Sequence, residues 1–215
     1  MRIWDDNHPK AGMMLGKRNM IIEAAGKVFL DSGYAESSMN RIADEAGVSI
    51  KTVYRHFENK DDLFVAVIKV ACIAFSDEDE DLNVEPTWFK EAPLKALSIA
   101  GLAYIRHVVD KNHVALFRVI NRDSHKFPEL GKKYHQEVVS PRNQRLLSYL
   151  SKWKDECNWA IIDAEMAANS FAALLRGQIF EDILLGFQSP SDKELVNHVN
   201  KTVSLMLQLL ESGKF

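Results

Sequence analysis

Five side chains between positions 51 and 56 can all donate hydrogen bonds, and no carboxylate interrupts them: Lys51, Thr52, Tyr54, Arg55 and His56. Donors and positive charge gathered on one surface are what contact with phosphate oxygens and reading of base edges require. The pattern therefore predicts a nucleic-acid-binding surface. The alternative is an ordinary helical hairpin whose outer face happens to be polar.

The donors lie on the second of two short predicted helices. Ser38 can cap the first helix, from Met39, and Ser49 the second, which we expect to run through Phe57, because a serine hydroxyl accepts from the free amides of a first turn. Gly47 can adopt the left-handed conformation that ends a helix. Apolar residues at helical spacing line the inner faces: Ile42, Ala43, Ala46, Ile50, Val53 and Phe57. Two short helices joined by a tight glycine turn form a helix-turn-helix.

Apolar residues recur at helical spacing in most of the remaining chain, so the expected fold is all-α. We divide the chain into a flexible N-terminal arm (1–15), a helix-turn-helix DNA-binding domain (16–59) and a helical body (60–215), whose first helix (60–76) links the two. Pro141 is expected to kink or split a helix over 128–157.

The stretch that contains the helix-turn-helix, which we call the head, resembles the N-terminal DNA-binding domain of TetR-family transcriptional regulators, over roughly residues 17–67. The resemblance is carried by Phe29, Gly33-Tyr34, Ser38, Ile42-Ala43, Ala46-Gly47-Val48-Ser49, Thr52-Val53-Tyr54, His56-Phe57 and Asn59-Lys60-Asp61-Asp62-Leu63. It implies a two-domain, all-helical homodimer with a three-helix DNA-binding head and a larger body that senses a ligand and dimerises. In the body, 117–120, 127–131 and Pro141-Arg142 resemble the AefR-like branch of this family.

The resemblance also implies particular DNA contacts. It implies that DNA phosphates are contacted by Ser38, Thr52, Tyr54, His56 and Lys60. It also implies that Asn40, Lys51 and Arg55 lie within reach of base edges or of the DNA backbone. Lys17 and Arg18 face the phosphates in the same geometry. Lys51 and Arg55 depart from the usual family pattern, which leaves the operator sequence open. A two-fold symmetric dimer requires a pseudo-palindromic operator in double-stranded DNA, with half-sites roughly 34–36 Å apart.

A ligand pocket is expected between helices of the body, as is common in helical bundles. Its candidate lining combines apolar residues with polar anchors: Leu102, Ile105, Arg106, Phe117, Ile120, Tyr134, Val138, Arg142, Phe171 and Leu175. For each of them, ordinary core packing or a solvated surface charge is the alternative. The ligand expected from the family is a small organic molecule of unknown identity.

The last two predicted helices are candidates for the dimer interface, because one carries small residues and the other a strong apolar stripe. The residues proposed for it are Ala167, Phe171, Leu174, Val199, Val203, Met206 and Leu210. Packing of these helices onto their own body is the alternative.

Composition limits the remaining functions. With 47% hydrophobic and 27% charged residues and a formal net charge of −3, the chain reads as a soluble globular protein whose DNA-binding charge must be concentrated locally. Isolated cysteines and the absence of a signal peptide predict a cytoplasmic protein, and no apolar run is long enough to enter a membrane. The acidic run 77–81 lacks the spacing of a calcium loop and is interpreted as a linker. No cofactor, metal or catalytic motif is recognised.

These observations predict a transcriptional repressor released from its operator by a small organic ligand. One alternative is a constitutive architectural or cell-division regulator with the same head and no ligand. Another is a small-molecule-binding module or an enzyme that carries a vestigial DNA-binding head.

Overall fold

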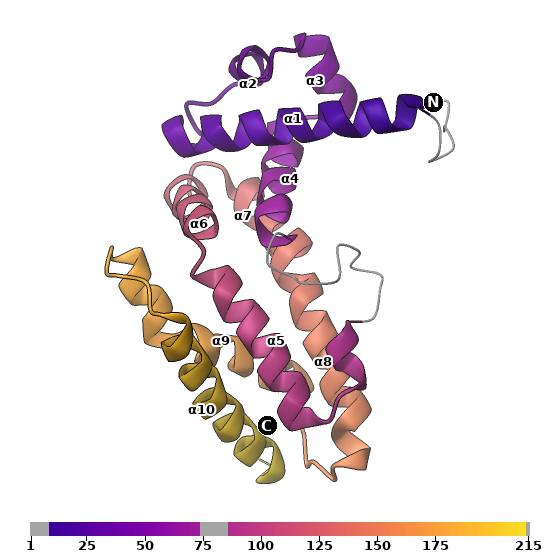
Figure 1. The fold of residues 1–215 in the computed structure, drawn as a ribbon, viewed down its shortest axis with the longest axis vertical. Coiled ribbons are helices and arrows are strands. Elements are labelled where there is room, and N and C mark those ends of the chain that lie inside the picture. Colours follow the sequence, from indigo (N-terminus) through magenta and orange to yellow (C-terminus); the bar gives the residue numbers. More distant parts are fainter. Residues whose placement is uncertain (1–8, 74–85, 214–215) are drawn as a thin grey trace. The chain divides into compact units, whose positions relative to one another are not determined.

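The computed structural model describes residues 9–73 and 86–213, and all regular structure in these two stretches is helical (Figure 1). The helices form two compact units. Unit 1 contains Met1–Val70 and Ala115–Tyr134, and unit 2 contains Ala71–Val114 and His135–Phe215. The chain therefore passes from one unit to the other three times.

The head of unit 1 consists of helices α1 (Pro9–Ser32), α2 (Met39–Glu45) and α3 (Ile50–His56), and α4 (Lys60–Ile73) follows directly. Its core is a set of fully buried apolar side chains: Ile21, Ala25, Phe29, Ile42, Val53, Leu63 and Phe64. The rings of Phe29 and Phe64 meet edge to face at 4.8 Å between centroids, a geometry that adds about 0.5–1.5 kcal/mol to area burial. This core fixes how α3 is presented.

Helix α1 begins at Pro9 and therefore extends into the predicted flexible arm (1–15). The additional turns contain Lys, Ala, Met and Leu, which are good helix formers, and a proline is tolerated in a first turn. Of the predicted arm, residues 1–8 lie outside the described residues. Helix α3 ends one residue early, because Phe57 has an extended backbone and caps it.

Unit 1 also contains most of α6 (Lys111–Asp123) and all of α7 (Pro128–Tyr134). The predicted boundary after residue 59 therefore differs from the observed grouping. The reason is burial: Leu63, Phe64 and Ile68 of α4 are almost fully buried, so this helix is part of a core rather than an exposed connection. The predicted linking helix is helical as far as Ile73, and its remaining residues lie outside the described part.

Unit 2 contains the short 3-10 helix η1 (Thr87–Lys90), α5 (Pro93–Val108), the π-helix η2 (His135–Val139), α8 (Ser140–Glu156), α9 (Ala164–Leu184) and α10 (Asp192–Glu211). Helix α5 packs against α9 and α10 (Figure 1). Gly101 allows this close approach, since a Cβ there would lie 3.2 Å from Val199 Cγ1 and 3.3 Å from Phe171 Cζ. The described core of the body is thus built around α5.

The expected disturbance at Pro141 is present as the π-helix η2, which joins α7 to α8. Proline lacks an N–H and its ring clashes with the carbonyl four residues earlier, so the preceding turn widens. Helix α10 begins with a capping box: Glu194 N donates to Ser191 Oγ and Ser191 N donates to Glu194 Oε2. Helix α9 has a kink at Gly177, which the sequence reading did not predict.

Candidate nucleic-acid interface

The turn between α2 and α3 has the predicted geometry. Ser38 Oγ accepts from the N–H of Arg41 at 3.2 Å, and Ser49 Oγ accepts from the N–H of Thr52 at 3.2 Å. Gly47 has φ of 64°, a conformation that costs other residues free energy because of their Cβ. These local contacts fix the start and direction of α3 and hence the surface that it displays.

Helix α3 displays the predicted donors on its outer face. Lys51 and Arg55 are exposed, and Tyr54 keeps 54% of its surface accessible, whereas Val53 on the opposite face is fully buried. Thr52 is half-buried, and its hydroxyl lies 2.9 Å from Ser49 Oγ. Exposed donors on a helix that is anchored through its other face can reach phosphates and base edges.

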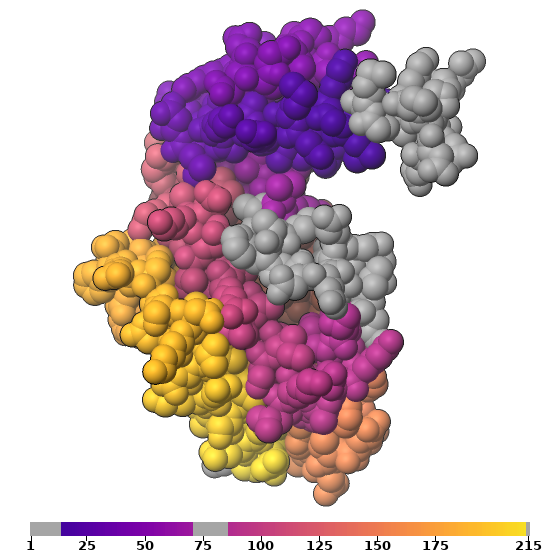
Figure 2. All heavy atoms as spheres, viewed as in Figure 1, coloured from indigo at the N-terminus to yellow at the C-terminus, as the bar shows by residue number. Residues whose placement is uncertain are grey.

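Lys17 and Arg18 of α1 add positive charge beside the end of α3. The Arg18 guanidinium lies 5.1 Å from the centroid of the Phe57 ring. Burial lowers the pKa of His56, and the charges of Arg55, Arg18 and Lys17 lower it further. The lowered pKa favours the neutral form of His56. The space-filling view shows α1 and the α2–α3 segment as one continuous surface (Figure 2).

His56 Nε2 is itself buried and has no hydrogen-bond partner in the described residues. Ser38 and Asn40, at the start of α2, are exposed. Arg41 is exposed as well but is held by Asp31, with 2.5 Å between Arg41 NH2 and the Asp31 carboxylate. The predicted DNA-binding residues thus come together on the head, and Arg18 joins them.

Lys60 is placed differently from the other predicted contacts. Its half-buried ammonium donates to the carbonyl oxygens of Tyr34 at 2.7 Å and Ser37 at 2.9 Å, and lies 4.2 Å from the centroid of the Tyr34 ring. Burial lowers the pKa of Lys60, while the charges of Asp123 and Glu36 raise it. Lys60 therefore holds the α1–α2 turn, and at most one of its three N–H groups remains for a phosphate.

The same turn is held from α6 by Asp123, whose side chain is nearly buried. One of its carboxylate oxygens accepts from the backbone N–H of Tyr34 at 2.8 Å and of Ala35 at 3.2 Å. Arg122 donates to both oxygens, at 2.9 and 3.0 Å, and these hydrogen bonds are the main cause that lowers the pKa of Asp123. Lys133 of α7 pairs with Asp62 of α4. These contacts join positions far apart in the chain, so no local sequence pattern indicates them.

The residues predicted to line a ligand pocket fall in both units. Phe117, Ile120 and Tyr134 belong to unit 1, and Leu102, Ile105, Arg106, Val138, Arg142, Phe171 and Leu175 belong to unit 2. Ile105, Ile120, Phe171 and Leu175 are buried, as ordinary core packing would also require. Arg106 is exposed and forms an ion pair with Asp192 at 2.7 Å, so the structure places this anchor on the surface.

Six of the seven residues proposed for the dimer interface are buried within the single chain: Ala167, Phe171, Val199, Val203, Met206 and Leu210. Leu174 is half-buried. The stripe on α10 therefore packs onto its own body, through the contacts with α5 that Gly101 permits. Apolar side chains that remain exposed on the other faces of α9 and α10 include Met166 and Leu205, at 48% and 44%.

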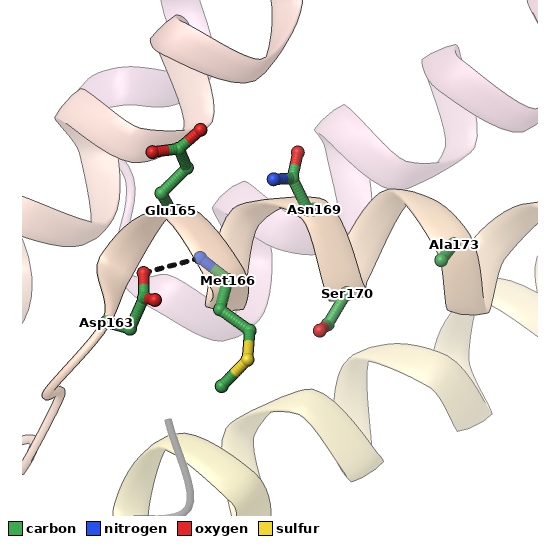
Figure 3. Close-up of a pocket in the computed structure, with 6 residues that line it drawn as sticks. All are labelled: Asp163, Glu165, Met166, Asn169, Ser170 and Ala173. Atoms are coloured by element: carbon green, nitrogen blue, oxygen red, sulfur yellow. Dashed lines mark hydrogen bonds between the residues drawn. The ribbon is translucent and has the colours of Figure 1, made fainter.

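A hollow of about 390 Å³ lies along the start of α9 (Figure 3). Its lining comes from α9 and its N-cap: Asp163, Glu165, Met166, Asn169, Ser170 and Ala173. None of these is a predicted pocket residue. Because its lining comes from α9 and its N-cap alone, this hollow lies open along the helix rather than enclosed.

No group of three or more His, Cys, Asp and Glu side chains in 9–73 and 86–213 is arranged to hold a metal ion. No helix in the same stretches is long and apolar enough to cross a membrane.

The chain is similar to two known protein-family profiles. The profile described as "Bacterial regulatory proteins, tetR family" matches residues 21–67. The profile described as "AefR-like transcriptional repressor, C-terminal domain" matches residues 95–209. Together they cover the head and most of the remaining chain.

Individual relatives match to different extents. The HTH-type transcriptional activator FasR of Mycolicibacterium smegmatis is 43% identical over 53 residues, which cover 25% of this chain and 24% of FasR. The HTH-type transcriptional regulator YhgD of Bacillus subtilis is 28% identical over 174 residues, 79% of this chain and 85% of YhgD. The chain thus matches only about a quarter of the length of FasR.

Among solved structures, the Flavonoid-responsive Regulator FrrA has a TM-score of 0.72 and 26% sequence identity, and the match covers 90% of this chain and 96% of that one. The similarity in fold therefore extends over both units.

Proposed function

Because the chain belongs to the TetR family of bacterial regulatory proteins, we propose that it is a sequence-specific DNA-binding regulator of transcription that acts in the cytoplasm. The observation that supports this proposal most directly is the exposed donor face of α3, with Lys51, Tyr54 and Arg55 open to solvent. Lys17 and Arg18 of α1 supply further positive charge.

We assign two kinds of contact to this surface. Lys51 and Arg55 read base edges in the major groove, where a bidentate arginine on guanine contributes about 1–3 kcal/mol of discrimination. The sugar–phosphate backbone of DNA is contacted by Lys17, Ser38, Asn40, Thr52, Tyr54, His56 and Lys60. We assign one phosphate to the third N–H of Lys60 and a second to His56, whose buried Nε2 must first become accessible.

The protein acts as a homodimer on a pseudo-palindromic operator in this proposal, with half-sites roughly 34–36 Å apart. The face of α9 that carries Met166, Ser170 and Ala173 and borders the hollow is assigned to the second copy, because small residues allow helices to approach closely. Sedimentation equilibrium of the wild type and of Met166→Glu tests this assignment. We expect the wild type to be a dimer and Met166→Glu to be a monomer. A monomeric wild type would contradict the assignment.

We further propose that a small organic ligand in the body releases the protein from DNA, so that it acts as a repressor. The AefR-like repressor profile over residues 95–209 supports repression rather than activation. The similarity to the Flavonoid-responsive Regulator FrrA supports a small organic molecule as the signal. Release requires only that the ligand bind more tightly to the conformation that does not fit the operator. A promoter–reporter assay with the operator inserted distinguishes repression from activation.

Selection from random duplex DNA by the full-length protein tests the DNA-binding proposal. We expect enrichment of one two-fold symmetric sequence. Arg55→Ala should enrich the same sequence with one base pair of each half-site relaxed. Lys27→Ala, which removes an equal charge from the exposed i,i+4 pair with Glu23, should enrich the full wild-type sequence. Failure to enrich any sequence would contradict the proposal.

A further inference from the structure

Unit 2 contains a group of polar side chains from three helices, which we name the polar cluster: Tyr104 and His107 of α5, His113 at the start of α6, and Arg142 of α8. The rings of His107 and His113 lie 4.2 Å apart between centroids. The Arg142 guanidinium lies 4.6 Å from the centroid of the Tyr104 ring. All four residues belong to one compact unit.

The two imidazoles of the polar cluster are neutral at physiological pH. Burial is the main cause that lowers the pKa of His107 to about 3 and of His113 to about 4, and the charge of Arg142 lowers both. Arg176 also acts on His113, whereas Asp110 and a hydrogen bond with the Val108 carbonyl act in the opposite direction. A neutral imidazole can both donate and accept one hydrogen bond.

Arg142 is the charged member of the polar cluster, and it is half-buried. It donates to the side-chain oxygen of its neighbour Asn143, at 3.1 and 3.2 Å. Within 9–73 and 86–213, no carboxylate forms an ion pair with it. A partly desolvated guanidinium that has only a neutral amide as acceptor gains free energy from an anion.

Tyr104 supplies a second donor beside this guanidinium. Its hydroxyl is buried and has no hydrogen-bond partner in the described part of the chain. Buried hydroxyl groups are usually paired, because an unpaired one loses its hydrogen bonds with water without replacement. A donor and a positive charge thus lie side by side inside the body, and both lack a negatively charged oxygen.

We propose that the polar cluster binds the carboxylate of an organic acid, with Arg142 and the Tyr104 hydroxyl as its donors. This inference rests on the proposed function and specifies the chemical class of the ligand that the body senses. A planar carboxylate accepts two parallel hydrogen bonds from a guanidinium. Its negative charge compensates the positive charge of Arg142, which no carboxylate of the polar cluster balances. A cationic ligand would be repelled, and a neutral one would leave Arg142 unpaired.

The test measures binding of two acids to the full-length protein by isothermal titration calorimetry, and compares each acid with its methyl ester. The probes are dodecanoate, with an aliphatic body, and 2-naphthoate, with an aromatic one. We expect at least one acid to bind at least tenfold more tightly than its ester. The acid that binds then identifies which kind of apolar body the site accepts.

Two variants and one control locate the site. Arg142→Gln should weaken binding of the acid at least tenfold and leave the ester unchanged. Tyr104→Phe keeps the ring beside Arg142 and should weaken binding of the acid. It should keep or raise the melting temperature of the protein, because it removes an unpaired hydroxyl. Arg106→Gln removes a charge from the exposed pair between α5 and Asp192 and should bind the acid as the wild type does.

The inference is overturned if neither acid binds, if acid and ester bind equally, or if Arg142→Gln binds the acid as the wild type does. Selection from random DNA with the same preparation separates this failure from that of the proposed function. Enrichment of an operator without acid binding refutes the ligand class alone, whereas absence of enrichment refutes the DNA-binding role.

Discussion

Two arginines on different parts of the molecule show how one side chain can serve two recognition tasks. Arg55 is exposed on α3, among donors between positions 51 and 56 that no carboxylate interrupts in the sequence. Arg142 is half-buried over the Tyr104 ring and next to two neutral imidazoles. An exposed guanidinium suits a large polyanion, because the polyanion can reach it. The same exposure means that salt screens the interaction. A partly buried one suits a single small anion, because it is screened less. The head and the body are therefore expected to differ in how salt affects their binding.

The largest expected effect on the free energy of unfolding comes from the core of the head, whereas its exposed surface should contribute little. Phe29 is fully buried and packs against Phe64, so Phe29→Ala should lower the free energy of unfolding by about 3–5 kcal/mol. Tyr54→Ala, on the exposed face, should change it by less than about 0.5 kcal/mol and yet weaken operator binding. Urea unfolding followed by circular dichroism measures the first quantity. Equal destabilisation by the two substitutions would mean that Tyr54 is structural.

Removal of the carboxylate that joins α6 to the α1–α2 turn should have the next largest effect. Asp123→Ala leaves the N–H groups of Tyr34 and Ala35 without their acceptor, at a cost of about 1–3 kcal/mol in the free energy of unfolding. Because the pKa of Asp123 is lowered in the folded state, its contribution is present above the ordinary aspartate pKa of about 3.9 and is lost as the pH falls below it.

Unfolding at a series of pH values checks this contribution. The wild type should lose stability between about pH 4 and pH 2 more steeply than Asp123→Asn does. Parallel curves for the two proteins would show that the carboxylate charge at Asp123 contributes nothing to folding.

These contacts show what the sequence could and could not predict. The helix-turn-helix could be predicted because its determinants are local: a cap at Ser38, a cap at Ser49 and a left-handed glycine at position 47. The bond from Asp123 to Tyr34 could not, because it joins residues 89 positions apart and no local pattern indicates which carboxylate meets which amide. The same limit explains why Lys60 was expected to be free for phosphate.

The body illustrates a second limit. An apolar stripe such as the one containing Val199 and Met206 has the same spacing whether it packs on its own chain or on a partner, and here it is buried within the chain. Arg106 and Arg142 were both plausible anchors in sequence. One pairs with Asp192 on the surface and the other lies in the polar cluster. Only the packing of the helices separates such cases.

A third prediction sharpens the comparison between base reading and backbone contact. Arg55→Ala should weaken binding to the selected operator by about 1–3 kcal/mol and relax specificity at one base pair. Its effect on random DNA of equal length should be smaller. Fluorescence anisotropy with both duplexes measures the ratio, and equal losses on the two would identify Arg55 as a backbone contact instead.

The smallest expected effect distinguishes two lysines of the head. Lys17→Ala and Lys60→Ala should each lower the slope of log K against log salt concentration by about one, since each removes one phosphate contact. Lys60→Ala should in addition destabilise the fold, because it releases the Tyr34 and Ser37 carbonyls. A salt slope that is unchanged in Lys60→Ala would restrict Lys60 to its structural role.

The central claim is that the face of α3 bearing Lys51 and Arg55 reads a specific DNA sequence. The most direct measurement is the affinity of the full-length protein for its selected duplex, relative to random duplex, before and after the double substitution Lys51→Ala and Arg55→Ala. We predict a large preference for the selected duplex in the wild type and nearly none in the double variant, with the fold unchanged. A preference that survives the double substitution would contradict the account.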